Sequence, residues 1–123
     1  MTKPIILMVE SDIPTIELYR GALSEKYEVL ARSNQTDVLE ILLTVDVRAI
    51  ILEPALAGGR GWGIFAAICD ANRERPVPVI VCTTSDERKR GLKMGATAFL
   101  VKPVLPGELL EALRQLQHFD SIN

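Results

Sequence analysis

The stretch AIILEPALAGGRGW, residues 49–62, places a carboxylate at the end of a hydrophobic run. Residues 49–52 are all apolar, Glu53 follows them, and a proline and a glycine-rich stretch come next. A short run that is apolar throughout is typical of a strand covered on both faces of a sheet. The sequence therefore predicts a buried strand with a glutamate just beyond its carboxyl end.

Four more runs of this kind occur along the chain. The five predicted strands cover residues 5–9, 27–31, 49–52, 77–82 and 98–101. Residues 27–31 mix polar and apolar side chains, which favours the edge of the sheet. Helical spacing of apolar residues follows each strand, and the fourth helix is expected to be short, because residues 84–87 resemble a capping box and Gly95 ends it.

Strand and helix alternate five times in this chain of 123 residues, which is the length of one domain. Such alternation predicts an α/β fold with a doubly wound five-stranded parallel sheet and helices on both faces. In folds of this type, ligands bind beyond the carboxyl ends of the strands. The residues that follow each strand are therefore the candidates for function.

Composition excludes several other classes of protein. The net charge of -2 gives no general attraction to nucleic acid or to an anionic membrane, and no apolar run is long enough to span a bilayer. The start of the chain lacks the pattern of a secretory signal. Cys69 and Cys82 have apolar neighbours and no metal-like spacing, so both are predicted to be buried, reduced thiols of a cytoplasmic protein.

Acids, hydroxyls and a lysine follow four of the five predicted strands. They are Glu10, Ser11, Asp12, Glu53, Thr83, Thr84 and Lys102. An acidic cluster that faces a lysine and a hydroxyl could hold a hard cation and a phosphoryl group. Helix capping, strand-end hydroxyls and a solvated glutamate remain the alternative, purely structural interpretation of the same residues.

Five segments in order resemble the receiver domain of response regulators, the CheY-like family, over essentially the whole chain. They are ILMVESD, AIILEPALAGGRGW, VPVIVCTT, GATAFLVKP and ELLEAL, of which GATAFLVKP is the most specific. The resemblance implies strand order 2-1-3-4-5 and a receiver-like domain over residues 1–117. Residues 118–123, including a surface histidine at His118, are expected to form a frayed tail.

The resemblance also implies a magnesium-assisted transfer of phosphate from a histidine kinase to a carboxylate after the third strand. Glu53 stands in the acceptor place, and Glu10 and Ser11 stand in the places of the acidic pair that holds magnesium. Asp12 is the next acid, and it is also a candidate helix cap.

Further family positions surround this acceptor. Thr83 matches the hydroxyl that binds a phosphoryl oxygen, Lys102 the lysine that pairs with it, and Phe99 the switch aromatic. Gly61 matches the glycine of the loop after the acceptor. The bond between Lys102 and Pro103 matches a peptide that is usually cis.

Three departures from the family pattern bear on the chemistry. The acceptor is Glu53 where the family has aspartate, Ser11 replaces an acid, and Ala57 stands where a proline is usual while Pro54 adds one. A glutamate reaches about 1.5 Å further than an aspartate, and a misplacement near 1 Å can cost about 100-fold in rate. We therefore expect no cofactor, at most weak magnesium binding by Glu10 and Glu53, and signalling that is independent of phosphorylation.

Lys102 is predicted to bridge Glu10, Glu53 or both, because opposite charges a few ångströms apart stabilise each other. The longer carboxylate of Glu53 would then imitate the charge of a phosphoryl group. A receiver with relaxed acceptor chemistry is one alternative function. A small flavodoxin-like enzyme or ligand-binding protein is another, which a single histidine and the lack of a glycine-rich phosphate loop disfavour.

The predicted fourth helix carries a basic patch, made of Arg88, Lys89, Arg90 and Lys93. A solvated helix face is one interpretation, and contact with an acidic protein partner is the other. The family implies a histidine kinase or an output domain as partners and a homodimer through helix 4, strand 5 and helix 5. We expect no enzyme activity, and no contact with nucleic acid or membrane. For Trp62 the sequence leaves two roles open, packing in the core or contact with a partner.

Overall fold

Five parallel strands form one sheet in the computed structural model of the protein. The structure describes the backbone of residues 2–122 and the side chains of residues 2–56 and 58–116. The strands are β1 (Ile5–Val9), β2 (Glu28–Arg32), β3 (Val47–Leu52), β4 (Val79–Thr83) and β5 (Ala98–Val101). The predicted bounds of β1 and β5 are confirmed, and the other three strands differ from prediction by one or two residues at their ends.

The order of the strands in the sheet is β2-β1-β3-β4-β5, with every neighbouring pair parallel. This order confirms the predicted doubly wound topology, and it places the mixed strand β2 at an edge. Neighbouring strands end nearly level: Val9 pairs with Leu52, Leu52 with Val81, and Thr83 with Val101. The residues that follow β1, β3 and β5 consequently emerge at one edge of the sheet.

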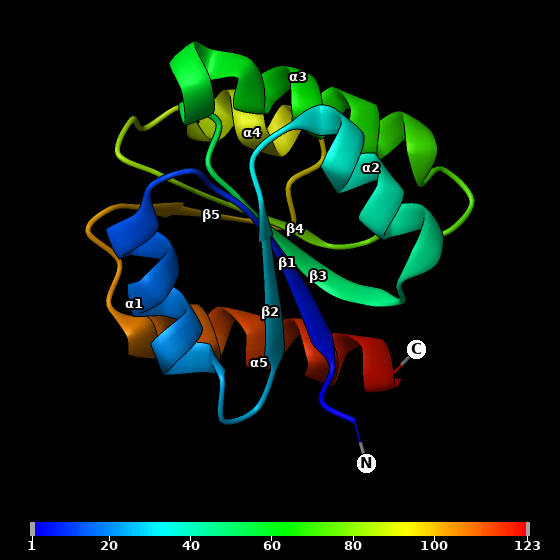
Figure 1. The fold of residues 1–123 in the computed structure, drawn as a ribbon, viewed down its shortest axis with the longest axis vertical. Helices are drawn as coiled ribbons and strands as arrows, with labels where there is room; N and C mark the ends of the chain where they lie inside the picture. Colours follow the sequence, from blue (N-terminus) through cyan, green and yellow to red (C-terminus); the bar gives the residue numbers. More distant parts are fainter. Residues whose placement is uncertain (1, 123) are drawn as a thin grey trace.

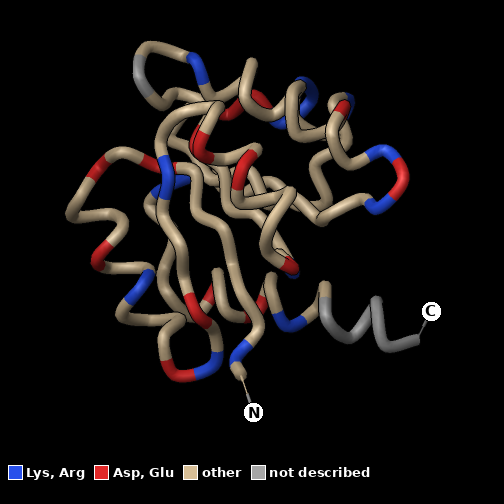
Figure 2. The backbone as a smooth tube through the Cα atoms, turned by 45° about the vertical axis from the view of Figure 1, so that its right-hand side comes forward, with Lys and Arg blue, Asp and Glu red and all other residues tan. Residues whose placement is uncertain are grey.

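Two layers of helices cover the sheet (Figure 1). Helices α1 (Ile13–Leu23) and α5 (Pro106–Ile122) lie together on one face. Helices α2 (Gln35–Thr44), α3 (Leu56–Ala71) and α4 (Arg88–Lys93) lie on the other. Charged residues occupy the helices and loops, whereas the central strands carry few of them (Figure 2).

Alternate residues of each strand enter different halves of the core. Leu7 and Val9 of β1 pack with α2 and α3, whereas Ile6 and Met8 pack with α1 and α5. This alternation follows from the two-residue repeat of a strand. Strands buried on both faces explain why the sequence shows continuous apolar runs and not an alternating pattern.

Two features of the structure correct the sequence predictions. Cys82 is buried, but Cys69 is exposed, and its thiol donates to the backbone oxygen of Met94 at 3.6 Å. The capping box is also wrong: Glu87 holds the N-cap position of α4 without a side-chain hydrogen bond. Helix α4 is nevertheless short, and Gly95 follows it with a φ of 104°, as predicted.

Two predicted features lie outside the described side chains. Helix α5 extends to Ile122, but the side chains of residues 117–123 are not described, so the frayed tail and the surface position of His118 stay predictions. The side chain of Ala57 is likewise outside the described set.

The loop after β3 folds back on its own start. The amide of Gly61 donates to the backbone oxygen of Pro54 at 3.1 Å, so the beginning of α3 lies directly on the residues that follow Glu53. A Cβ atom at Gly61 would come within 2.5 Å of the Cα atom of Pro54. Only glycine allows this approach, which fixes the backbone that carries Glu53.

Replacing Gly61 with alanine is therefore expected to lower the free energy of unfolding by about 1–3 kcal/mol, as overpacking against rigid backbone does. Urea unfolding followed by circular dichroism measures it. Gly63→Ala is the matched control, because a Cβ atom there meets nothing within 4 Å and should gain up to about 1 kcal/mol in helix propensity. Equal stability of the two variants would contradict the close approach at Gly61.

Candidate functional site

Three charged side chains meet at the carboxyl edge of the sheet. Glu10 follows β1, Glu53 follows β3 and Lys102 follows β5. Backbone hydrogen bonds hold all three positions: the amide of Glu10 donates to Arg32 at 3.1 Å, that of Glu53 to Val9 at 3.0 Å, and that of Lys102 to Thr83 at 2.8 Å. The cluster is therefore built by the register of the strands, and its members come from three distant parts of the chain.

The ammonium of Lys102 bridges both carboxylates. Its Nζ atom lies 3.1 Å from Oε1 of Glu10 and 3.1 Å from Oε1 of Glu53. The side chains are 16% (Lys102), 7% (Glu10) and 11% (Glu53) exposed, so the ions are largely withdrawn from water. The predicted bridge is confirmed, and it joins Lys102 to both acids at once.

Burial and the two carboxylates act on the pKa of Lys102 in opposite directions. Burial lowers the pKa, but the hydrogen bonds and charges of Glu10 and Glu53 outweigh it, and the pKa is raised above its ordinary value. The lysine therefore stays protonated at neutral pH and serves as the counter-ion of the cluster.

The second oxygen of each carboxylate accepts backbone hydrogen bonds. Oε2 of Glu10 accepts from the amides of Ser11 and Asp12 at 3.0 and 3.3 Å, and Oε2 of Glu53 accepts from the amide of Ala55 at 3.2 Å. Charge-assisted bonds of this kind fix the orientation of a carboxylate. Both acids are thus held by the main chain on one side and by Lys102 on the other.

A small cavity of about 10 Å³ lies next to the cluster, with room for about one water molecule. Tyr19 and Cys82 line it together with the three charged residues, and the Tyr19 hydroxyl lies 3.9 Å from the Cys82 sulfur. Burial is the main cause that raises the pKa of Tyr19 to about 12 and raises the pKa of the Cys82 thiol, so both groups stay neutral. Sequence reasoning missed both residues here; the signal for Cys82 was its place directly before Thr83.

Several residues expected at the site do not join the charged cluster. Asp12 is exposed and caps α1, accepting hydrogen bonds from the amide and hydroxyl of Thr15, which lower its pKa. Thr83 is buried, and its hydroxyl takes no part in the hydrogen bonds described for the cluster. Phe99 packs into the core beside α3. All four basic residues of α4 are exposed, and two of them, Arg88 and Arg90, lie over the rings of Phe99 and Trp62.

These residues do not fit a magnesium site. No group of three or more metal-ligating side chains occurs in the part of the chain that the structure describes. The Lys102 ammonium already lies between the two carboxylates that a cation would need, Ser11 offers no acid, and Asp12 is directed to Thr15. Magnesium demands near-ideal octahedral oxygen ligands, which this arrangement does not supply.

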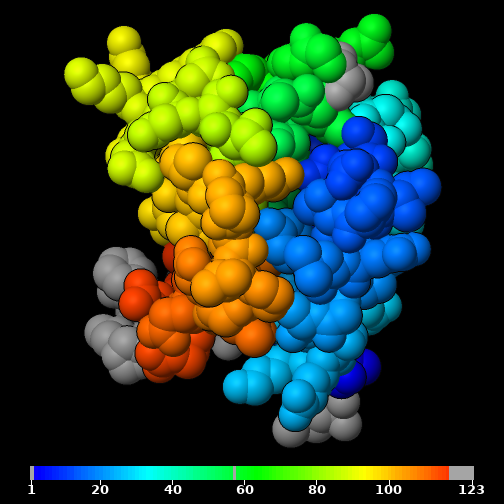
Figure 3. Space-filling view, turned by 90° about the vertical axis from the view of Figure 1, so that its left-hand side faces the viewer, coloured from blue at the N-terminus to red at the C-terminus, as the bar shows by residue number. Residues whose placement is uncertain are grey.

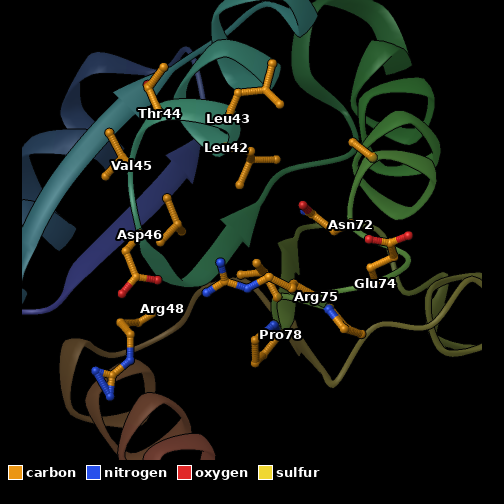
Figure 4. Close-up of a pocket in the computed structure, with 14 residues that line it drawn as sticks. Leu42, Leu43, Thr44, Val45, Asp46, Arg48, Asn72, Glu74, Arg75 and Pro78 are labelled. Atoms are coloured by element: carbon orange, nitrogen blue, oxygen red, sulfur yellow. The ribbon is translucent and has the colours of Figure 1, made fainter.

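A separate hollow of about 550 Å³ lies at the opposite edge of the sheet (Figure 4). It is bounded by the end of α2, the start of β3 and the loop between α3 and β4. Leu42, Val45 and Pro78 mix there with Asp46 and Arg75. This hollow shares no residue with the cluster, because it sits at the amino ends of strands whose carboxyl ends form the site.

The fold and the cluster define a class of doubly wound α/β proteins with acids and a lysine at the carboxyl edge. The sequence profile of the response regulator receiver domain matches residues 6–114. The chain belongs to this family, whose members act in two-component signalling.

Individual relatives agree with this membership. The chain is 35% identical to the transcriptional regulatory protein HprR of Escherichia coli over 96% of this chain and 54% of that protein. It is 33% identical to the probable transcriptional regulatory protein SilR of Salmonella typhimurium, over 90% and 50%. The chain thus spans about half the length of the curated relatives it matches.

Solved structures support the fold. The chemotaxis protein CheY4 of Vibrio cholerae superposes with a TM-score of 0.82 at 25% identity, covering 94% of this chain and 99% of that one.

Among the residues that the structure describes, no helix has the length and apolar character that a membrane span requires.

Replacing Lys102 with methionine is expected to leave two carboxylates facing each other without a counter-ion. The loss in free energy of unfolding should be on the order of 2 kcal/mol near pH 7. The raised pKa of Lys102 sets the sign with pH: its stabilising contribution is fully present below the ordinary lysine pKa of 10.5 and is lost as pH rises through the higher folded value. Urea titrations of both proteins between pH 7 and 11.5 should therefore show a shrinking difference.

Lys89→Met is the control for that series. Lys89 is exposed, so this substitution removes the same charge from the surface and not from the cluster. A difference between the wild type and Lys102→Met that does not change with pH would contradict the ionic bridge.

Proposed function

We propose that this receiver domain signals by protein–protein contact and does not depend on phosphorylation. The proposed unit is residues 1–117, with Glu53 in the place of the phosphoacceptor and no catalytic residue of its own. The observation that carries the proposal is the double bridge from Lys102 to Glu10 and Glu53, 3.1 Å to each.

Glu53 in this arrangement resembles an acceptor that already carries its charge. Its carboxylate reaches Lys102 without any added group, and the amide of Ala55 holds the other oxygen. A phosphoryl group on Glu53 would have to replace the contact between Glu53 and Lys102 and tolerate a largely buried environment. The longer side chain and the missing acid at Ser11 both disfavour the transfer.

In this proposal the acidic pocket has only structural roles, which are carried by Glu10, Ser11 and Asp12. Glu10 shares Lys102 with Glu53, Ser11 supplies an amide to Glu10, and Asp12 caps α1. Thr83 and Phe99 stand in the positions of the phosphoryl-binding hydroxyl and the switch aromatic. In this proposal they keep their places in the core without a phosphorylation step.

Partners are inferred from the family and from charge. The curated relatives are named as transcriptional regulators and are about twice as long, so an output domain or a histidine kinase is the kind of protein partner that fits. The exposed basic side chains of α4 favour an acidic surface on that partner. They are Arg88, Lys89, Arg90 and Lys93. A homodimer through α4, β5 and α5 would use the same side of the domain.

Acetyl phosphate labelling tests the independence from phosphorylation. The wild type with magnesium is expected to stay unlabelled, because Lys102 and not a metal neutralises the acids. The double variant Ser11→Asp, Glu53→Asp restores the two family acids and is expected to gain magnesium-dependent label. Intact-mass spectrometry at low temperature measures the phosphoryl label on the wild type and on the double variant.

Beryllofluoride gives a second reading of the same site, since it stands in for a phosphoryl group on a carboxylate. In amide NMR spectra of the wild type, magnesium followed by beryllofluoride should leave Glu10, Glu53, Thr83 and Lys102 unshifted. Label on wild-type Glu53, or shifts spreading from the site to Phe99, would establish the alternative function, a receiver with relaxed acceptor chemistry.

The basic face is tested separately with poly-L-glutamate as an acidic probe. Reversing the charges of Arg88, Lys89 and Arg90 to glutamate is expected to abolish binding in isothermal titration calorimetry at low salt. Replacing Arg73 and Arg75 of the distant α3–β4 loop with glutamate is the control, which should lose less. Equal loss in both variants would show a net-charge effect and contradict a specific partner face.

A further inference from the structure

Helix α4 is attached to the domain in an unusual way. Between Thr84 and Lys93 the only buried residue is Gly91, and Leu92, the one large apolar residue of the helix, is 49% exposed. An ordinary surface helix buries an apolar stripe against the core. Helix α4 has no such stripe, no side-chain cap, and only six residues.

Aromatic rings from neighbouring elements take the place of that stripe. Gly91 lies so close to Phe99 that a Cβ atom there would be 2.7 Å from the ring, and Trp62 of α3 is the next neighbour. Phe99 and Trp62 are each only 8% exposed. The backbone of α4 therefore covers two large rings that belong to β5 and α3.

Two arginines of α4 complete this cover. The guanidinium of Arg90 lies 4.3 Å from the centre of the Trp62 ring, and that of Arg88 lies 5.8 Å from the centre of the Phe99 ring. Cation–π contacts at exposed sites contribute modestly to stability. Arg90 also pairs with Glu87 at 3.4 Å, but both side chains are about half exposed, which makes the pair weak.

We propose that α4 is a displaceable cover over Trp62 and Phe99, and that an acidic protein segment binds by drawing Arg88 and Arg90 away from these rings. The proposal rests on the basic partner face put forward above and adds how that face responds to its partner. Segments with few buried apolar contacts open at lower free energy than the rest of a domain. The glycine at residue 95, with its positive φ, allows the backbone to turn at the end of the helix.

Charge complementarity identifies the partner's chemistry. A hollow at α4 is lined by three of its four cations, Arg88, Lys89 and Arg90, and also by Asp86, Glu87 and Leu92. Figure 3 shows this yellow-green to yellow segment projecting from the surface beside the chain around β5. Carboxylates that pair with the arginines would compete directly with the rings, and the uncovered rings would then offer an apolar contact to the same segment.

Hydrogen exchange of the free protein tests the cover without any partner. Arg90→Gln is expected to speed exchange of the amides of residues 88–95 by about two- to fivefold, because one cation–π contact is lost. Lys89→Gln removes the same charge from the same helix and should change nothing. Glu87→Gln removes only the ion pair and should also change little. Equal exchange rates of these amides in Arg90→Gln and Lys89→Gln would contradict the proposal that Arg90 holds α4 over Trp62.

Fluorescence of Trp62, the single tryptophan of the chain, tests the response to an acidic partner. Poly-L-glutamate is expected to increase acrylamide quenching of Trp62 in the wild type, and an equal ionic strength of sodium chloride should not. Binding in calorimetry without a change in the quenching of Trp62 would contradict the displacement of α4, but it would agree with an acidic partner at the basic face. No binding at all would overturn the acidic partner, and the exchange experiment would still report on the cover.

Discussion

The ammonium of Lys102, held between the carboxylates of Glu10 and Glu53, is the interaction on which the carboxyl edge of this domain depends. Three parallel strands bring these groups to one place, and the cation between the two acids offsets the repulsion of their negative charges. In a family whose members carry acids at this edge, a protein side chain here does the work of charge neutralisation.

Backbone geometry supports this bridge as much as charge does. The amides of Ser11, Asp12 and Ala55 hold the outer oxygens of the two acids. Gly61 packs on the backbone that leaves Glu53, so the loop cannot move without losing that contact. The site combines backbone hydrogen bonds to both acids with one largely buried cation between them.

The surface above β5 has the opposite character. Helix α4 is short and polar, and it is held by arginines stacked on Trp62 and Phe99 in place of buried apolar side chains. The charged cluster is held by largely buried ion pairs, whereas α4 is held by exposed arginines that lie against two rings. Partner binding there would be felt by Phe99, which packs on both α4 and the core.

The sequence by itself determined the fold class, the strand order through family resemblance, and the list of residues at the strand ends, because apolar runs and alternation are local signals. It also favoured a bridge from Lys102 to the acids. Only the tertiary structure decided that Lys102 contacts both Glu10 and Glu53, that Asp12 turns away to cap α1, and that Cys69 is exposed. It alone revealed Tyr19 and Cys82 beside the cluster and the arginines over Trp62 and Phe99. The Asp12 cap is a local contact with Thr15, three residues away, and the sequence left it open against a place in the acidic cluster. The other contacts join residues far apart in the chain, whose distances are set by strand register and helix packing and leave no local trace in the sequence.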